Sequence, residues 1–279
     1  DNDGDQDLAL AQGWYLMLME NDGQARFTKR LETPAQGQLH SLAAADYDND
    51  GDLDIYFCGR NPRREQTQSE GILGMPIPYH DANNGGPNVL LDNQGGWKFA
   101  DVTLSRGLDV NNRRYSYACS WEDYDNDGDQ DLYVANDFGR NNLYRNDVSI
   151  DGKFRDVSAQ AGVEDISAGM GVTWGDPNRD GRMDAYVSNM FSAAGNRIAY
   201  QRHYRADLEN GQLGQFQRHA RGNTLFLNRG EKFDDASEAA NVTMGRWAWG
   251  AKFADLNNDG WEDLYVANGF ITTPDTGDL

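Results

Sequence analysis

Short runs of alternating apolar and small residues recur along the chain and predict β-strands. In four places, mostly apolar side chains stand at a spacing of two just before an aspartate-rich stretch, as Tyr117, Cys119 and Trp121 do. A spacing of two places side chains on one face of a strand. The residues between them are mostly small, so each of these strands is expected to have one bulky face and one small face.

A second run of β-branched, aromatic and aliphatic residues follows each aspartate-rich stretch, as in Leu132 to Ala135. Such composition and length are typical of a strand. Two further strands follow in the complete copies, separated by polar turns of the kind that hairpins need. The third strands are expected at 88–93, 141–146 and 223–228, and the fourth at 99–103, 154–158 and 233–237. The predicted unit is therefore a sheet of four antiparallel strands.

This unit repeats along the chain, and radially packed four-stranded sheets are typical of a β-propeller. The expected copies are about 1–36 without its first strand, 37–111, 112–166, 167–244, and 245–279 with two strands only. We therefore expect residues 1–279 to form a single all-β region that is a partial arc of a larger propeller. The open sheet edges are expected to pair with remaining blades of a parent chain or with a neighbouring subunit.

Two insertions interrupt the repeat, at about 60–86 and 191–222. The first is rich in proline and glycine and is expected to be a loop. The second holds five arginines and is expected to form one or two short helices broken at Gly211. It is the only basic segment of an acidic chain. Two interpretations stay open: it binds a partner, or it folds over acidic loops of its own chain.

The aspartate-rich stretches between first and second strands share one pattern of metal ligands. Oxygen-bearing side chains occupy positions 1, 3, 5 and 9, glycine at position 6 permits a sharp turn, and position 7 is expected to contribute its main-chain carbonyl. Six to eight oxygen ligands suit Ca²⁺, with Mg²⁺ as the alternative. The candidate ligands are Asp1, Asp3, Asp5 and Asp7 in loop 1; Asp46, Asp48, Asp50, Asp52 and Asp54 in loop 46; Asp123, Asp125, Asp127, Asp129 and Asp131 in loop 123; Asp176, Asn178, Asp180, Arg182 and Asp184 in loop 176; and Asp255, Asn257, Asp259, Trp261 and Asp263 in loop 255.

These five loops predict up to five Ca²⁺ ions, one in each. Loop 1 lacks the first two positions of the pattern. An EF-hand is excluded, because position 12 would be a bidentate Glu, whereas here residues such as Val134 continue a strand. Loops 46 and 123 are expected to bind most tightly, since Asn178 and Asn257 each remove one charge. Loop 1 is expected to bind most weakly.

The repeated motifs also resemble a known family. The string D-Y-D-N-D-G-D-x-D-L-Y-V-A-N, followed by N-x-L-Y-x-N and F-x-D-V-S, is similar to the FG-GAP or VCBS repeats of integrin α-type propellers. It resembles most closely the cartilage acidic protein and ASPIC/UnbV-type extracellular proteins. The resemblance covers nearly the whole chain outside the insertions. It implies a propeller of about seven blades, Ca²⁺ in the loops, and a location that is secreted, on the cell surface or periplasmic.

Charge and composition restrict the possible partners. The net charge of -20 and a pI near 4.4 argue against nucleic-acid binding, which needs basic patches. The longest apolar run, Leu8 to Met19, is too short to span a membrane. Cys58 and Cys119 are read either as two buried thiols or as one disulfide bridge.

No familiar catalytic motif stands out in the sequence. His40 occupies a strand position and is expected to pack in the core. The first functional hypothesis is a calcium-stabilised extracellular module that binds or adheres to protein or glycan partners. One alternative is a carbohydrate- or phosphate-ester-active enzyme whose site lies in the insertions. The other is a structural component of an extracellular assembly.

Overall fold

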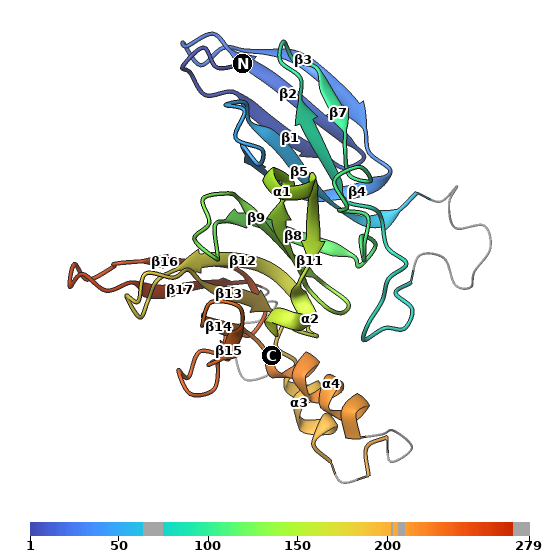
Figure 1. Cartoon of the computed structure of the whole chain (residues 1–279). Coiled ribbons are helices and arrows are strands. Elements are labelled where there is room, and N and C mark those ends of the chain that lie inside the picture. Colours follow the sequence, from blue (N-terminus) through green and yellow to red (C-terminus); the bar gives the residue numbers. More distant parts are fainter. Residues whose placement is uncertain (64–74, 202, 206–209, 270–279) are drawn as a thin grey trace.

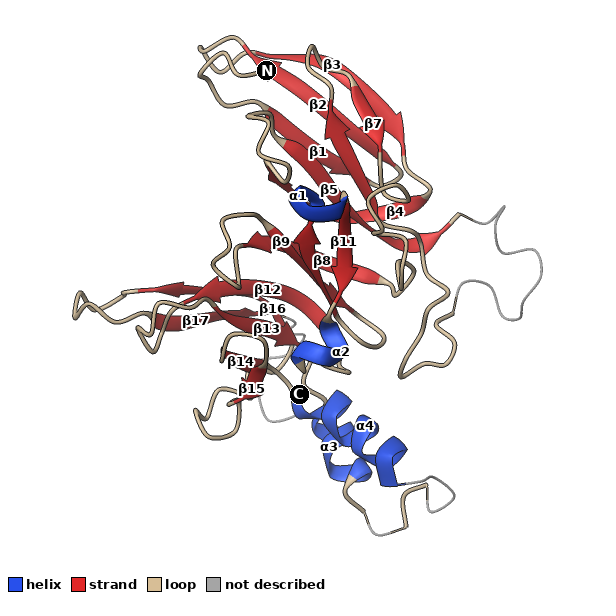
Figure 2. Ribbon diagram, viewed as in Figure 1, coloured by secondary structure: helices blue, strands red, loops and turns tan. Residues whose placement is uncertain are grey.

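The computed structural model describes residues 1–63, 75–201, 203–205 and 210–269 of the 279-residue chain. Strands dominate these residues, and helices occur only in short segments (Figure 2). The strands are β1 (Leu8–Gln12), β2 (Tyr15–Asn21), β3 (Phe27–Pro34), β4 (Gly37–Ala45), β5 (Asp54–Pro62), β6 (Val89–Asn93), β7 (Phe99–Asp101), β8 (Ser116–Glu122), β9 (Asp131–Asn136), β10 (Asn142–Asp147), β11 (Lys153–Asp156), β12 (Gly169–Gly175), β13 (Asp184–Asn189), β14 (Thr224–Asn228), β15 (Phe233–Asp235), β16 (Ala248–Ala254) and β17 (Asp263–Asn268). The helices are α1 (Val148–Asp151), α2 (Ser158–Ala161), α3 (Ala193–Ala199) and α4 (Asn210–Arg221).

The strands form antiparallel sheets in which chain order and spatial order agree. Three sheets have four strands: β4-β5-β6-β7, β8-β9-β10-β11 and β12-β13-β14-β15. The sheet β1-β2-β3 precedes them, and β16-β17 follows. The predicted all-β class with four-stranded antiparallel units is confirmed. The fourth strands end two residues earlier than expected, because the F-x-D-V-S segments leave the sheet after the aspartate.

The sheets stack side by side in an arc. Among the first strands, β4 contacts β8, β8 contacts β12, and β12 contacts β16. Figure 1 shows the blue N-terminal sheet at the top, and the β16-β17 hairpin lies beside β12 and β13, which it contacts. Over the part of the chain that the structure describes, the sheets form an open arc, as expected for part of a propeller.

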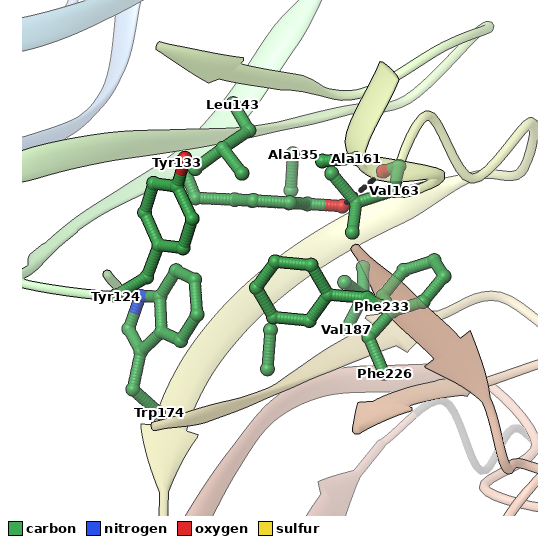
Figure 3. Close-up of a cluster of buried hydrophobic side chains, with 11 residues drawn as sticks. Tyr124, Tyr133, Ala135, Leu143, Ala161, Val163, Trp174, Val187, Phe226 and Phe233 are labelled. Carbon is green, nitrogen blue, oxygen red and sulfur yellow. Dashed lines mark hydrogen bonds between the residues drawn. The ribbon is translucent and has the colours of Figure 1, made fainter. Parts of the chain in front are cut away.

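Aromatic side chains fill the space between adjacent sheets. Between β8-β11 and β12-β15, the rings of Tyr124, Tyr133, Trp174 and Phe233 form one buried cluster (Figure 3). The hydroxyl of Tyr133 donates to the carbonyl oxygen of Val163 at 2.8 Å, drawn as a dashed line in Figure 3. A buried tyrosine needs such a partner, because an unpaired buried hydroxyl is costly.

The motifs of the third and fourth strands have structural roles. The Oδ1 atom of Asn141, which opens the third-strand motif, accepts from the N–H of Asn136 at 2.8 Å. The Oγ atom of Ser158 accepts from the N–H of Leu143 at 2.7 Å and donates to Asp156. Equivalent bonds recur in the neighbouring four-stranded sheets. These repeated polar positions therefore join strands within each sheet.

Both insertions connect a second strand to a third strand, whereas the aspartate-rich loops connect first strands to second strands. They therefore lie at the opposite end of the sheets from those loops. In Figure 1 the loops of β12-β13 and β16-β17 point to the left, while α3 and α4 lie at the lower right. The second insertion does contain two helices, but the expected break at Gly211 is wrong, because α4 runs through this residue. The first insertion is not all loop, since β5 extends to Pro62, and its residues 64–74 lie outside the described residues.

The expectation that His40 packs in the core is wrong. A register irregularity between Leu39 and Ser41 leaves His40 outside the strand ladder, and its side chain is exposed. Its ring lies 4.9 Å from that of Tyr117 in the next sheet. Both cysteines are free thiols, with Cys58 buried and Cys119 partly buried.

None of the helices that the structure describes has the length and apolar character needed to cross a bilayer.

Candidate metal centre

The first aspartate of each complete loop shapes the turn. In loop 123, Asp123 accepts from the N–H groups of Asp127 and Gly128, each at 3.0 Å. The same pair of bonds occurs in loops 46, 176 and 255. Each of these carboxylates therefore fixes the backbone of positions 5 and 6 and still has lone pairs for a cation.

Two positions of the turn have a left-handed backbone. Gly128 at position 6 has a φ of 94°, which explains the glycine that the sequence places there. Position 4 also has positive φ, 60° at Asn126. This role of position 4 was not anticipated from the sequence, although asparagine, which tolerates this conformation, stands there in every loop except loop 176.

The ninth aspartate is a buried anchor in the three inner loops. Asp131 accepts from the N–H of Asn146 at 2.7 Å and from the N–H of Tyr124 at 3.2 Å. Burial raises the pKa of Asp131 to about 9, and the nearby carboxylates of Asp125 and Asp129 add to the rise. Burial likewise raises the pKa of Asp54 to about 7 and that of Asp184 to about 6. A nearby cation favours the charged form of such groups.

Two loops bring three carboxylates together. In loop 123, one oxygen atom from each of Asp123, Asp125 and Asp131 lies within 4.8 Å of the others. In loop 46, Asp46 and Asp48 converge in the same way with Asp50. Among the described residues, these are the groups of three or more acidic, histidine or cysteine side chains that are close enough to hold a metal ion.

The donor set fits a hard cation. The Oδ1 atoms of Asp48 and Asp125, both at position 3, are buried and have no hydrogen-bond partner. Burial, together with neighbouring carboxylates, raises the pKa of both groups. Unpaired buried oxygen atoms are rare in proteins, and a Ca²⁺ ion bound by carboxylate oxygens would satisfy them. Asp129, at position 7, also has a buried and unpaired Oδ1 atom, and burial beside Asp127 raises its pKa to about 7.

Loops 176 and 255 have a different arrangement. In loop 176, the Nδ2 atom of Asn178 donates to Asp184 at 3.0 Å, so an amide lies where loop 123 has a second carboxylate. In loop 255, Asp255 is exposed and Asp263 is only partly buried. The position-7 side chains turn to other partners: Arg182 lies 3.6 Å from Asp180, and Trp261 stacks under the guanidinium of Arg179. Main-chain ligation at position 7 stays a prediction.

Loop 1 holds its expected side chains mostly at the surface. The carboxylate of Asp7, at position 9, accepts from the N–H of Asn21 at 3.0 Å, as the ninth aspartates of the inner loops do. Asp3 accepts from the N–H of Asp5 at 3.1 Å. Neither Asp1 nor its neighbours form a group of three converging carboxylates among the described residues.

Arginines near the loops were not anticipated from the sequence. The guanidinium of Arg106 lies 3.5 Å from Asp48 and also donates to the hydroxyl of Tyr47 at 2.9 Å. Arg229 reaches to 4.0 Å from Asp180. These cations offset part of the loop charge, so an estimate of affinity from the number of aspartates alone is incomplete.

The basic insertion makes ion pairs within its own chain. Arg218 bonds Asp165 at 3.0 Å and Asp235 at 2.9 Å, and Arg221 also bonds Asp235 at 2.9 Å. Asp165 is buried and Asp235 ends a fourth strand. These arginines thus hold α4 on its own sheet, at the end away from the metal loops.

The sheets, their order and their aspartate-rich hairpins define a propeller-type repeat protein. The FG-GAP-like repeat family matches residues 1–57, 123–187 and 214–266, and the chain belongs to this family.

Curated relatives agree with this assignment. Cartilage acidic protein 1 of Mus musculus is 26% identical over 291 residues, which cover 96% of this chain and 38% of the relative. The Homo sapiens protein of the same name is 26% identical over 296 residues, with the same shares. That of Xenopus tropicalis is 24% identical over 200 residues, covering 68% of this chain and 29% of the relative. The resemblance expected from the motifs is confirmed, and the chain spans about 38% of the length of the mouse and human relatives.

Proposed function

We propose that this chain is a calcium-stabilised extracellular propeller segment that serves as a protein- or glycan-binding module. The observation that carries the metal part is the convergence of Asp123, Asp125 and Asp131, with a buried Oδ1 atom of Asp125 that has no other partner. Loop 46 supplies a second such group. The word cartilage in the name of the relatives agrees with an extracellular setting.

The ion stabilises the fold by removing repulsion between carboxylates. Two like charges about 4 Å apart repel by about 4 kcal/mol at an effective dielectric of 20. Ca²⁺ replaces this repulsion with attraction and ties the first strand of a sheet to the second. Extracellular Ca²⁺ is millimolar, and sites in extracellular modules bind in that concentration range. Loops 46 and 123 would therefore be filled outside cells.

Thermal unfolding tests the metal part. The melting temperature is expected to rise when millimolar Ca²⁺ is added to protein freed of metal by a chelator. It should rise less with Mg²⁺, which demands strict octahedral geometry. The double variant D48N/D125N should lose most of the Ca²⁺ effect. The matched variant N49D/N126D changes charge at position 4, outside the ligand set, and should keep it. Equal melting temperatures with and without Ca²⁺ would contradict the proposal.

The binding part is assigned to the insertion end of the sheets. Long loops on a rigid scaffold often carry recognition, and two insertions meet here: the rings of His80 and Phe216 lie 4.9 Å apart, and those of Tyr79 and His219 lie 6.0 Å apart. Tyr79 is largely exposed. A glycan array and binding assays with extracellular matrix proteins, run with wild type and with Y79A, test this assignment. If Y79A binds the same partners with the affinity of wild type, the insertion end of the sheets is not the binding surface.

A further inference from the structure

The last asparagine of the third strand contacts two aspartate-rich loops at once. The Nδ2 atom of Asn146 donates to the carbonyl of Gln130 in loop 123 at 3.1 Å. It also donates to the carbonyl of Tyr47 in loop 46 at 2.7 Å, 99 residues earlier in the chain. One buried side chain therefore bridges loops that belong to neighbouring sheets.

Asn228 repeats this arrangement one sheet later. Its Nδ2 atom donates to the carbonyl of Met183 in loop 176 at 3.1 Å and to the carbonyl of Tyr124 in loop 123 at 2.7 Å. Both asparagines are buried. Two copies with equivalent partners at equal distances show that the bridge follows from the repeat and is not an accident of one loop.

The position of Asn146 is set by loop 123. Its N–H donates to Asp131 at 2.7 Å, and its Oδ1 atom accepts from the N–H of Val148 at 3.0 Å. Asp131 is a member of the carboxylate group of loop 123. When loop 123 becomes more or less ordered, the Nδ2 donor that Asn146 presents to the neighbouring loop therefore shifts with it.

The other end of the bridge lies between two candidate ligands. Tyr47 separates Asp46 from Asp48, and both belong to the carboxylate group of loop 46. The hydrogen bond to the Tyr47 carbonyl fixes the peptide that sets the spacing of these two carboxylates. The Tyr47 ring also packs against Phe154 of the next sheet, with ring centres 5.7 Å apart.

We propose that Asn146 and Asn228 are positioning residues that couple cation binding in neighbouring loops, linking loop 123 with loop 46 and loop 176 with loop 123. This inference rests on the Ca²⁺ binding proposed above. Occupancy of one loop raises the affinity of its neighbour by about two- to tenfold, the effect of one net hydrogen bond. The coupling is reciprocal, because linkage requires each site to affect the other equally.

The chain contains its own control. Asn93 holds the same place in the β4-β7 sheet: its N–H donates to Asp54 at 2.8 Å and its Nδ2 atom donates to the carbonyl of Leu53 at 3.2 Å. Both partners belong to loop 46. Among the described residues, N93A therefore removes side-chain bonds to one aspartate-rich loop, whereas N146A removes side-chain bonds to two.

Hydrogen exchange followed by mass spectrometry distinguishes the loss of bonds to one loop from the loss of bonds to two. The peptides to follow are those that cover 46–54 and 123–131. In chelator, N146A is expected to exchange faster than wild type in both peptides, and N93A only in 46–54. In a Ca²⁺ titration, N146A should shift the protection midpoint of both peptides by about two- to tenfold. If N146A does not fold, N228A provides the same test on 123–131 and 176–184.

A double-mutant cycle separates coupling from a purely structural role. D125N, which disables loop 123, should raise the Ca²⁺ midpoint of 46–54 in wild type by about two- to tenfold. In the N146A background it should have no further effect. The inference is overturned if D125N leaves the Ca²⁺ midpoint of 46–54 unchanged in wild type, or if N146A leaves 46–54 unchanged in both chelator and Ca²⁺. If wild type shows no Ca²⁺-dependent protection, the proposed function fails instead, and the chelator comparison of N146A with N93A still decides whether the bridge exists.

Discussion

The side-chain amide of Asn178 donates to the carboxylate of Asp184 at 3.0 Å. In loop 123 the equivalent residues are both carboxylates, Asp125 and Asp131, and they converge with Asp123. Loop 176 is therefore closed by an internal hydrogen bond where loop 123 has converging carboxylates. This difference gives a physical reason for the affinity order expected from the number of charges.

N178D should convert loop 176 toward the behaviour of loop 123. Ca²⁺ affinity at this loop is expected to rise by about tenfold, because a carboxylate replaces the amide. In chelator the variant should be less stable than wild type by about 1 kcal/mol, since Asp184 loses a donor and gains a like charge. Calorimetric titration and urea unfolding measure the two effects. N49D makes the same change at an exposed position 4, and an equal effect there would contradict the explanation.

S158A should destabilise the β8-β11 sheet. The Ser158 hydroxyl is buried and accepts from the N–H of Leu143, so its removal leaves a buried donor unpaired at a cost of about 1–3 kcal/mol. Urea unfolding in Ca²⁺ measures this loss. S105A removes an exposed hydroxyl that donates to the carbonyl of Val102, and it should change stability by less than about 0.5 kcal/mol. Equal losses in the two variants would show that the motif serine has no special role.

R218Q should loosen the basic insertion. The substitution leaves Asp165, which is almost fully buried, without its guanidinium partner. We expect a loss of about 2–3 kcal/mol, less than for a fully buried pair because water reaches part of Arg218. Exposed R197Q is the control, and urea unfolding compares the two variants. If R218Q lowers partner binding without lowering stability, Arg218 contacts partners directly and does not hold α4 on its sheet.

His219 should make stability depend on pH. Burial lowers its pKa from 6.5, nearby His80 lowers it further, and Asp165 acts in the opposite direction. The folded state therefore holds His219 neutral, while the unfolded chain takes up a proton as pH falls through about 6.5. His219 therefore leaves the free energy of unfolding unchanged above about pH 6.5 and lowers it as the pH falls below that value. Urea unfolding of wild type and H219Q at pH 8 and pH 5 should show wild type losing stability relative to the variant on acidification. A constant difference would contradict a buried neutral imidazole.

The sequence predicts the repeat and its strands well, because each sheet has the period-two pattern of strands and each loop carries aspartates at fixed spacing. The hairpin turn at Asp123 to Asp131 could be predicted from that spacing, whereas its binding of a cation stays a prediction. His40 could not be placed in the same way. Its neighbours in the repeat suggest a core position, but a local bulge, which depends on backbone geometry, turns it outward.

The connections between sheets could not be predicted from local pattern. Asn146 is visible as the end of a strand motif, yet its bond to Tyr47 requires two sheets to meet. Arg218 and Asp165, which are 53 residues apart, meet only when the insertion folds back against the chain. Contacts of both kinds depend on tertiary packing, and the pattern of one repeat carries no signal for them.

Isothermal titration calorimetry of metal-free protein with Ca²⁺ decides whether the aspartate-rich loops are metal sites. We expect saturable binding at up to millimolar Ca²⁺, with loops 46 and 123 filled first. D125N should lose one of these two tighter sites, while N126D should keep both. Absence of binding at millimolar Ca²⁺, or the same isotherm for D125N and wild type, would contradict a calcium-stabilised propeller.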